Sequence, residues 1–233
     1  MRLIILFYIL PLRKSSQTPF SKVNRTRALG AEVILEGRNL NECELTVNRI
    51  ISDRKMTLIH PYDDPLIITG QGTVGLEILE DVSELDVLVV PIGGGGLMAG
   101  IAVIAREINP KIQLIGVEAK LWPSMTSAIN SKPLACGGET LAEGIAVKSP
   151  GKLTSSIIEK LVDDILLVSE DYLERAISAI VEEQRLICEG AGAAGIASIM
   201  EYPDRFKGCY YADWDIKNER QLNYEMMYGT GKK

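Results

Sequence analysis

The stretch DVLVVPIGGGGLMAG, residues 86–100, constrains the fold of this chain more than any other part. The apolar run at 87–92 is typical of a strand that is buried on both faces, as in a parallel sheet covered by helices. Four glycines follow. Apolar residues then recur at helical spacing over 97–108, until Pro110 ends the pattern. The sequence therefore predicts a strand, a glycine loop and a helix.

The glycine loop has the character of an anion site. Four residues without Cβ let backbone N–H groups approach a ligand, at an entropic cost that a purely structural turn rarely carries. The loop also leads into a helix N-terminus, where unpaired N–H groups and the helix dipole favour negative charge. No Lys-Ser or Lys-Thr pair follows the glycines, so the Walker A pattern is not met. We predict a phosphate site, and a tight turn without a ligand is the alternative.

Composition excludes several classes of protein. With 46% apolar and 24% charged residues, the 233-residue chain has the make-up of a soluble globular protein, and its net charge of -6 argues against nucleic acid as a partner. Four scattered cysteines lack a CxxC pair, and His60 is the only histidine, so we expect no zinc ribbon and a structural His60. The apolar start, 1–11, is too short to cross a bilayer, and we expect a buried strand there, with a cryptic export signal as the alternative. A cytoplasmic protein without a membrane partner follows.

Short apolar strands alternate with longer helical patterns along the chain, which indicates a parallel α/β sheet. The predicted strands lie at 32–35, 57–59, 87–92, 113–117 and 164–168. The predicted helices lie at 22–29, 41–53, 74–82, 97–108, 122–131 and 155–162, with two more after Ser169 and within EGAGAAGIASIM. The segment 132–150 is irregular, and LAEGIAVKSPG, which closes it, is too apolar for an exposed linker, so we expect this last stretch to pack against the sheet or the ligand. From Gly208 onward the α/β pattern is lost.

Two cofactor classes fit the glycine loop. Gly94, Gly96 and Ala99 satisfy G-x-G-x-x-A after a strand, and Glu118 stands where a dinucleotide fold places its ribose-binding acid. An NAD-binding dehydrogenase is therefore one alternative. The additional glycines, however, make a rounder cup that suits a terminal phosphate better than a passing pyrophosphate.

Six motifs in order resemble one enzyme family. They are HPYDDPLIITGQGTVGLEIL, VVPIGGGGLMAGIA, IGVEA, LAEGIAVKSPGKLT, VDDILLVSEDYLERAI and EGAGAAGIA. This series is similar to the threonine ammonia-lyase (threonine dehydratase) and serine racemase family of fold-type II pyridoxal-phosphate enzymes. The resemblance runs from near Pro19 to near Gly208. It implies an incomplete tryptophan synthase β-like α/β fold, with a partial small domain at 1–69, a partial large cofactor-binding domain at 70–208 and an atypical tail at 209–233.

The resemblance also assigns site residues. It implies that the phosphate of pyridoxal 5'-phosphate is held by Gly93, Gly94, Gly95, Gly96 and the backbone of Leu97. Glu189, in EGAGA, lies where the family brings a carboxylate near the cofactor, and a carboxylate that only stabilises a helix N-terminus is the alternative. Glu118 resembles the acidic ligand of the family's divalent or monovalent cation, although Trp122 and Ser124 do not supply further acidic ligands.

The resemblance implies that L-threonine is converted to 2-oxobutanoate and ammonia, or L-serine to pyruvate, in a homo-oligomer. The family's Schiff-base lysine stands in a Ser-Phe-Lys-x-Arg-Gly motif, and this motif does not occur in the sequence. No catalytic residue can therefore be assigned, and we expect this chain to be catalytically incomplete. A further alternative is a non-catalytic fragment that pairs with an intact homologue.

Overall fold

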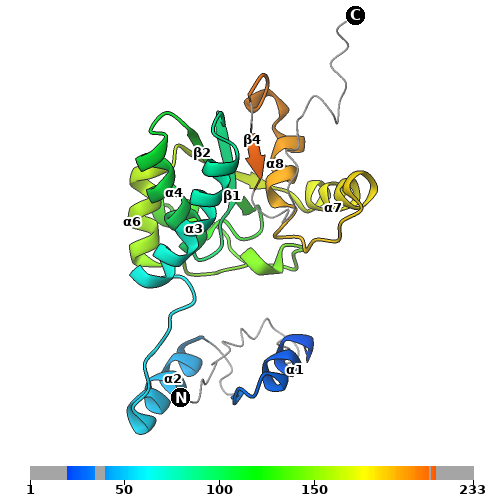
Figure 1. Cartoon of the computed structure of the whole chain (residues 1–233). Coiled ribbons are helices and arrows are strands. Elements are labelled where there is room, and N and C mark those ends of the chain that lie inside the picture. Colours follow the sequence, from blue (N-terminus) through cyan, green and yellow to red (C-terminus); the bar gives the residue numbers. More distant parts are fainter. Residues whose placement is uncertain (1–19, 35–39, 210, 214–233) are drawn as a thin grey trace, which may run out of the picture. The chain divides into compact units, whose positions relative to one another are not determined.

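The computed structural model describes residues 20–34, 40–209 and 211–213, and the chain divides into two compact units, Met1–Ile59 and His60–Lys233 (Figure 1). The strand expected at 1–11 lies outside the described residues. Among the described helices, none combines the length and the apolar character that a membrane crossing requires.

The described part of the first unit contains two helices, α1 (Phe20–Ala28) and α2 (Leu40–Arg54). Val47 and Ile50 are buried on one face of α2, as the helical spacing predicts. Arg54, at the end of α2, forms an ion pair of 2.7 Å with Glu32, and both side chains are about half exposed. The predicted strand at 32–35 is wrong, because only Glu32 makes a single bridge within the described part of this segment.

The second unit is built on a parallel sheet of four described strands, in the order β3-β2-β1-β4. The strands are β1 (Val87–Pro91), β2 (Gln113–Ala119), β3 (Asp164–Val168) and β4 (Tyr211–Asp213). Val87 pairs with Gln113 on one side and with Tyr211 on the other. The predicted β1, β2 and β3 are thus confirmed, whereas the expectation that the α/β pattern stops at Gly208 is wrong, because β4 extends the sheet beside β1.

Helices cover both faces of the sheet (Figure 1). The helices of this unit are α3 (Pro65–Asp81), α4 (Gly96–Ile108), α5 (Ser124–Ile129), α6 (Lys152–Leu161), α7 (Glu170–Ala179) and α8 (Ala194–Glu201). Short 3-10 turns lie at η1 (Glu143–Ile145) and η3 (Pro203–Arg205), and a π-helical turn, η2 (Ile180–Gln184), extends α7. The parallel α/β class predicted from the sequence is therefore confirmed.

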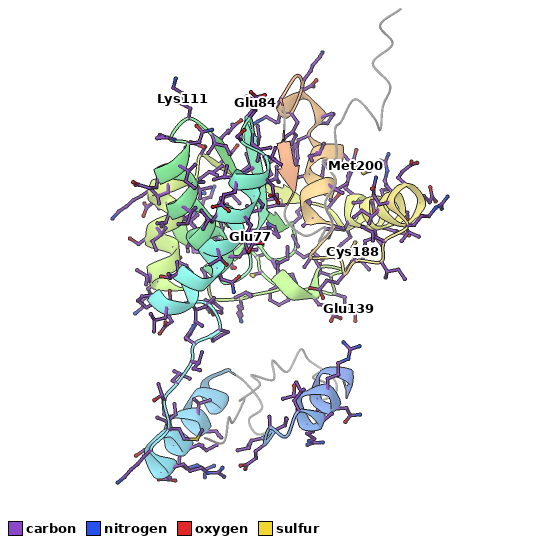
Figure 2. The ribbon with its side chains drawn as sticks, viewed as in Figure 1. Glu77, Glu84, Lys111, Glu139, Cys188 and Met200 are labelled. Atoms are coloured by element: carbon purple, nitrogen blue, oxygen red, sulfur yellow. The ribbon has the colours of Figure 1, made fainter. Side chains whose placement is uncertain are left out.

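The alternation of side chains along β1 explains why the sheet is covered twice. Leu88 and Val90 point into a first core, shared with α3, α4 and α6, while Val87 and Val89 point into a second core, shared with α7 and α8. All four are at most 1% exposed. Met200 of α8 and Cys188, both labelled in Figure 2, pack against the second core. The continuous apolar run of β1 is thus the signature of burial on both faces.

Helix α3 begins earlier than the sequence predicts. The side chain of Asp64 accepts hydrogen bonds from the N–H groups of Leu66 and Ile67, and Pro65 occupies the first turn, so cap and proline define the start together. The glycines of GQGTVG lie inside α3 rather than before it. A Cβ on Gly100 of α4 would lie 2.6 Å from the backbone nitrogen of Gly72, so these two helices cross with their backbones nearly in contact.

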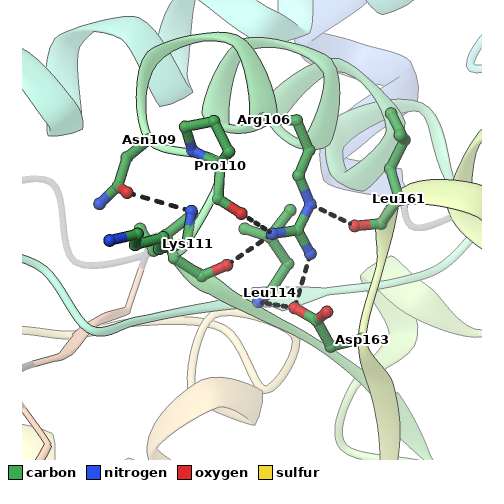
Figure 3. A network of polar contacts seen from close by, with 8 residues as sticks. Arg106, Asn109, Pro110, Lys111, Leu114, Leu161 and Asp163 are labelled. Atoms are coloured by element: carbon green, nitrogen blue, oxygen red, sulfur yellow. Dashed lines mark hydrogen bonds and ion pairs between the residues drawn. The ribbon is translucent and has the colours of Figure 1, made fainter.

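At the amino ends of the strands, opposite to the end that carries the glycine loop, Arg106 joins three elements (Figure 3). Its guanidinium donates to the carbonyls of Leu161 at 2.9 Å and Ile112 at 2.7 Å, and to Asp163 at 2.6 Å. Asp163 in turn accepts the N–H of Leu114 at 2.7 Å. The end of α4, the start of β2 and the end of α6 are therefore fixed to one another.

The strand predicted at 57–59 is also wrong. These residues have no regular structure, and Leu58 and Ile59 are exposed. Short runs of apolar residues predict a strand only when a partner strand is available, and none is described beside this segment.

Candidate functional site

The candidate site lies at the carboxyl end of β1, next to a change in the direction of the sheet. From β1 the chain continues through α4 to β2 on one side, whereas β4, on the other side of β1, follows helices that cover the opposite face. In open α/β sheets, ligands bind outside the carboxyl ends of the strands at such a switch point. The glycine loop stands there, between β1 and α4.

The glycine loop turns sharply into α4. Gly95 is the N-cap residue of α4 and has a φ of 94°, a left-handed conformation that favours glycine. A Cβ on Gly95 would also lie 2.6 Å from Cε of Met125 and 2.9 Å from Oγ1 of Thr154. Backbone geometry and lack of space therefore both require glycine at this position.

Protein atoms already cover the α-carbons of the other three glycines. A Cβ on Gly94 would overlap the ring of Tyr62, and one on Gly96 would lie 3.0 Å from Cα of the same tyrosine. A Cβ on Gly93 would lie 3.1 Å from Cα of Ile145. Close packing inside the protein thus accounts for the missing side chains, and what the loop offers to a ligand is its N–H groups.

Those N–H groups have no protein acceptor in the described part of the chain. The amides of Gly94, Gly95, Gly96 and Leu97 take part in none of the backbone or side-chain hydrogen bonds there, and α4 makes its first bond from Ala99 to the carbonyl of Gly95, at 2.9 Å. Gly94, Gly95 and Gly96 are nevertheless buried. Buried N–H groups without a partner are costly, so a set of them at a helix N-terminus fits an anionic ligand.

The segment 142–147 links the glycine loop to Glu189. Ile145 contacts Gly93, as shown above, and a Cβ on Gly144 would lie 2.8 Å from Oε1 of Glu189. The structure therefore brings Gly93 and Glu189 to the two sides of one short segment, while the Glu189 side chain itself remains exposed. Ala142 and Ile145 belong to the second core, which confirms the expectation that this irregular segment packs against the sheet.

Glu118 is fully buried, and its carboxylate is engaged by α5. Oε1 accepts the N–H of Met125 at 2.7 Å, and Oε2 accepts the N–H and the hydroxyl of Thr126 at 2.9 and 2.6 Å. Burial raises the pKa of Glu118, although these bonds lower it in part. The hydroxyl of Ser124, beside this group, is buried and has no hydrogen-bond partner in the part of the chain that the structure describes. The described residues contain no group of three or more His, Cys, Asp or Glu that could hold a metal ion.

The loop before α3 reaches the glycine loop as well. Nδ1 of His60 accepts the N–H of Asp63 at 2.7 Å, so the single histidine shapes this turn, as expected. The Tyr62 hydroxyl donates to the carbonyl of Ser149 at 2.8 Å, and the carboxylate of Asp63 accepts three N–H groups from the start of α6.

Sequence reasoning missed four residues that contact the site. Tyr62, Asp63, Gly144 and Thr154 all lie in motifs that the sequence singles out, but only the fold shows that Tyr62 and Thr154 contact the glycine loop, that Gly144 adjoins Glu189, and that Asp63 binds the start of α6 beside Thr154. The available signal is the pair of aspartates in HPYDDP. Asp64 caps α3, which leaves Asp63 to accept hydrogen bonds from a different helix, α6.

Comparison with known proteins agrees with this geometry. A family described as pyridoxal-phosphate dependent enzyme matches residues 7–209. An L-threonine ammonia-lyase from Thermotoga maritima is 42% identical over 188 residues, which cover 80% of this chain and 47% of the relative. The processed threonine deaminase isoform 2 from Solanum lycopersicum superposes with a TM-score of 0.74 at 34% identity, over 82% of this chain and 56% of that one. A maize serine racemase gives a TM-score of 0.76 at 32% identity, over 82% and 58%.

The chain thus spans about half the length of the curated relative from Thermotoga maritima. The NAD-binding alternative is not supported, because Glu118 is enclosed by α5 instead of being available to a ribose, and because these neighbours are pyridoxal-phosphate enzymes of fold type II. With a strand, a glycine loop and a helix at the switch point, and with a family match over most of its length, this chain belongs to the pyridoxal-phosphate dependent enzyme family.

Proposed function

We propose that this chain binds pyridoxal 5'-phosphate and that its glycine loop holds the phosphate. The observation that supports this proposal is that the N–H groups of the buried Gly94, Gly95 and Gly96 and of the half-buried Leu97 have no acceptor in the described chain. A terminal phosphate supplies several acceptor oxygens and a charge that the N-terminus of α4 stabilises. Gly93 completes the loop on the side of Ile145.

Glu189 is the second part of this proposal. Its carboxylate lies beside Gly144, which in turn adjoins the residue that contacts Gly93, so a cofactor anchored by its phosphate in the loop would extend past a negative side chain. A carboxylate on this side of the segment could orient the ring or a bound amino acid by accepting a hydrogen bond from it.

For the reaction, we propose α,β-elimination from a small hydroxy amino acid, L-threonine to 2-oxobutanoate and ammonia or L-serine to pyruvate. The names of the relatives supply this proposal. The bound cofactor supplies an electron sink for the negative charge that develops when the α-proton leaves. Because the Ser-Phe-Lys-x-Arg-Gly motif does not occur in the 233 residues, we propose that this polypeptide binds the cofactor with little or no lyase activity of its own.

The cation expected at Glu118 fits the structure poorly. Both carboxylate oxygens already accept hydrogen bonds from α5, and Ser124 contributes a hydroxyl in place of a second acidic ligand. We therefore propose that the Glu118 carboxylate caps α5 and is not a ligand of a cation. Homo-oligomer formation and a cytoplasmic location remain part of the proposal.

The test is an absorbance titration of the purified chain with pyridoxal phosphate, compared among wild type, Gly95→Ala and Gly70→Ala. Gly95→Ala meets both a φ of 94° and Met125, whereas a Cβ on Gly70 meets no atom within 4 Å, which makes it a matched control. We expect saturable binding in wild type and Gly70→Ala, weakened at least about tenfold by Gly95→Ala.

Borohydride reduction followed by mass spectrometry then shows whether a lysine is linked to the cofactor. We expect no single modified lysine and no threonine-dependent 2-oxobutanoate. One specific lysine adduct, with 2-oxobutanoate production that a bulky substitution at Gly94 abolishes, would show that the chain is an active lyase. Equal cofactor binding by wild type and Gly95→Ala would contradict the phosphate site itself.

A further inference from the structure

In the glycine loop, the carbonyl of Gly94 is hydrogen-bonded to other parts of the protein, whereas the N–H groups of 94–97 have no acceptor among the described residues. The carbonyl of Gly94 accepts the hydroxyl of Thr154 at 2.7 Å and the N–H of Gly151 at 3.2 Å, both from the start of α6. Because a trans peptide is planar, the carbonyl of Gly94 and the N–H of Gly95 point in opposite directions. Fixing that carbonyl on α6 therefore directs the Gly95 N–H away from α6.

Thr154 is held in place by a carboxylate from a distant part of the chain. Thr154 is fully buried, and its N–H donates to Oδ1 of Asp63 at 3.1 Å. Asp63 also accepts the N–H groups of Lys152 and Leu153, each at 3.0 Å. His60 fixes Asp63 by accepting its N–H at 2.7 Å. A continuous series of hydrogen bonds thus leads from the turn before α3, through α6, to the peptide of Gly94.

The Asp63 carboxylate also makes the N-terminus of α6 less able than that of α4 to bind an anion. Its carboxylate accepts the first N–H groups of α6, so it satisfies the donors and the positive end of the dipole there. The N-terminus of α4, whose preceding residue Gly94 is hydrogen-bonded to the start of α6, keeps its own N–H groups without a protein acceptor in the described chain. Of the two neighbouring helix starts, only that of α4 is therefore open to a phosphate.

From these contacts we infer that Asp63 and Thr154 are positioning residues for a phosphate monoester: they hold the Gly94 peptide so that the loop presents its N–H groups. Neither residue contacts the ligand itself. The inference rests on the proposed phosphate site and adds to it the residues that set its geometry.

The experiment measures the part of the affinity that depends on the phosphate. Pyridoxine 5'-phosphate and pyridoxine are the probes, because they lack the aldehyde and cannot react with surface lysines. Their dissociation constants are measured by titration with the full chain. The dissociation constant of pyridoxine divided by that of pyridoxine 5'-phosphate isolates the phosphate contribution. Thr154→Val removes the hydroxyl at constant shape, Thr154→Ser retains it, and Thr73→Val removes an exposed hydroxyl of α3 as a matched control.

We expect wild type, Thr154→Ser and Thr73→Val to share one ratio, and Thr154→Val to lower it roughly tenfold, the effect of losing about one well-placed hydrogen bond. Asp63→Asn adds a test of sign. If Asp63 acted only as a negative charge near the anion, its neutralisation would tighten phosphate binding. As a positioning residue, it should loosen binding instead, because an amide cannot accept from three N–H groups at once.

Each outcome has one meaning. If wild type binds both probes equally, the glycine loop is not a phosphate site, and the proposed function and this inference fail together. If wild type prefers the phosphate probe while Thr154→Val and Asp63→Asn keep the wild-type ratio, the inference fails and the phosphate site stands. If Thr154→Val does not fold, as shown by its unfolding transition, the sign of the Asp63→Asn effect decides.

Discussion

Glu118 and Thr126 are joined by two hydrogen bonds, one of 2.9 Å from the Thr126 N–H and one of 2.6 Å from its hydroxyl, both to Oε2 of the carboxylate. A third bond, from Met125, engages the other oxygen. The carboxylate thus acts as the cap of α5, a helix whose own first residues supply no acidic side chain. This arrangement makes a fully buried acid part of the fold beneath the candidate site.

The buried Glu118 should make stability depend on pH. Burial raises the pKa of Glu118 above its ordinary value of 4.5, so the folded state holds this proton more tightly than the unfolded state. The stabilising contribution is therefore complete below pH 4.5 and is lost as pH rises through the raised pKa. Glu118→Gln cannot ionise. We expect the difference in unfolding free energy, wild type minus Glu118→Gln, to fall as pH rises and then to level off.

Urea unfolding of both proteins over a pH series beginning near 4.5 measures this difference. Taking the difference removes the titration of the exposed carboxylates, which both proteins share. Parallel stability profiles would show that the folded and unfolded states hold the Glu118 proton equally.

Replacing Arg106 by lysine should lower the stability of the fold. Its planar guanidinium reaches the carbonyls of Leu161 and Ile112 together with Asp163, whereas an ammonium group cannot direct donors at all three (Figure 3). We expect Arg106→Lys to lower the unfolding free energy by about 2 kcal/mol, mainly through the carbonyls left without a donor. Urea denaturation measures the loss.

The matched control is Arg205→Lys. Arg205 makes one exposed ion pair of 2.6 Å with Asp164, with side chains 45% and 38% exposed, and such pairs contribute at most about 1 kcal/mol. Equal effects of the two substitutions would mean that the Arg106 network contributes only as a surface charge.

The crossing of α3 and α4 should not tolerate a methyl group. A Cβ on Gly100 would lie 2.6 Å from the backbone nitrogen of Gly72, and backbone cannot move aside as a flexible side chain can. We expect Gly100→Ala to cost at least about 2 kcal/mol, through separation of the helices. Gly70→Ala, in an exposed and open position of α3, should instead stabilise by about 0.5–1 kcal/mol. Thermal unfolding of both variants gives the comparison, and a stable Gly100→Ala would mean that α3 and α4 can slide apart at little cost.

Gly144 should be coupled to Glu189. A Cβ on Gly144 would lie 2.8 Å from Oε1 of Glu189 and 3.0 Å from Cβ of Ala191, so Gly144→Ala must displace one of them. Because Oε1 is the end of a flexible and exposed side chain, it can move at little cost to the fold, and we expect roughly twofold to threefold weaker binding of pyridoxal phosphate through the displaced carboxylate. A double-mutant cycle with Glu189→Gln measures whether the effect passes through the carboxylate. Strictly additive effects would place the damage elsewhere in the segment.

The sequence predicts the centre of this molecule well, because its pattern there is local. The strand, glycine loop and helix of 87–108 need only burial on two faces and helical spacing to be recognised, and the structure places β1 and α4 where these patterns indicate. The α7 helix is likewise found from its amphipathic face. In each case neighbouring residues alone determine the element.

The errors arise where a distant part of the chain decides. Gly72 stands inside a helix, against its propensity, because α4 approaches too closely for any side chain. Residues 57–59 resemble a strand but have no partner strand among the described residues. Asp63 and Thr154 are 91 positions apart in sequence, so no local pattern could indicate their hydrogen bond. The site residues implied by family resemblance remain predictions, with Gly93 and Glu189 brought to one segment by the fold.

The position of β4 has a consequence for synthesis on the ribosome. β1 lies between β2 and β4, and β4, at Tyr211–Asp213, is the last described strand to be translated. Until that segment emerges, the nascent sheet exposes the unpaired amides and carbonyls of its most apolar strand. Such an edge is open to pairing with another chain, so we expect the risk of aggregation during synthesis to fall once β4 has paired with β1.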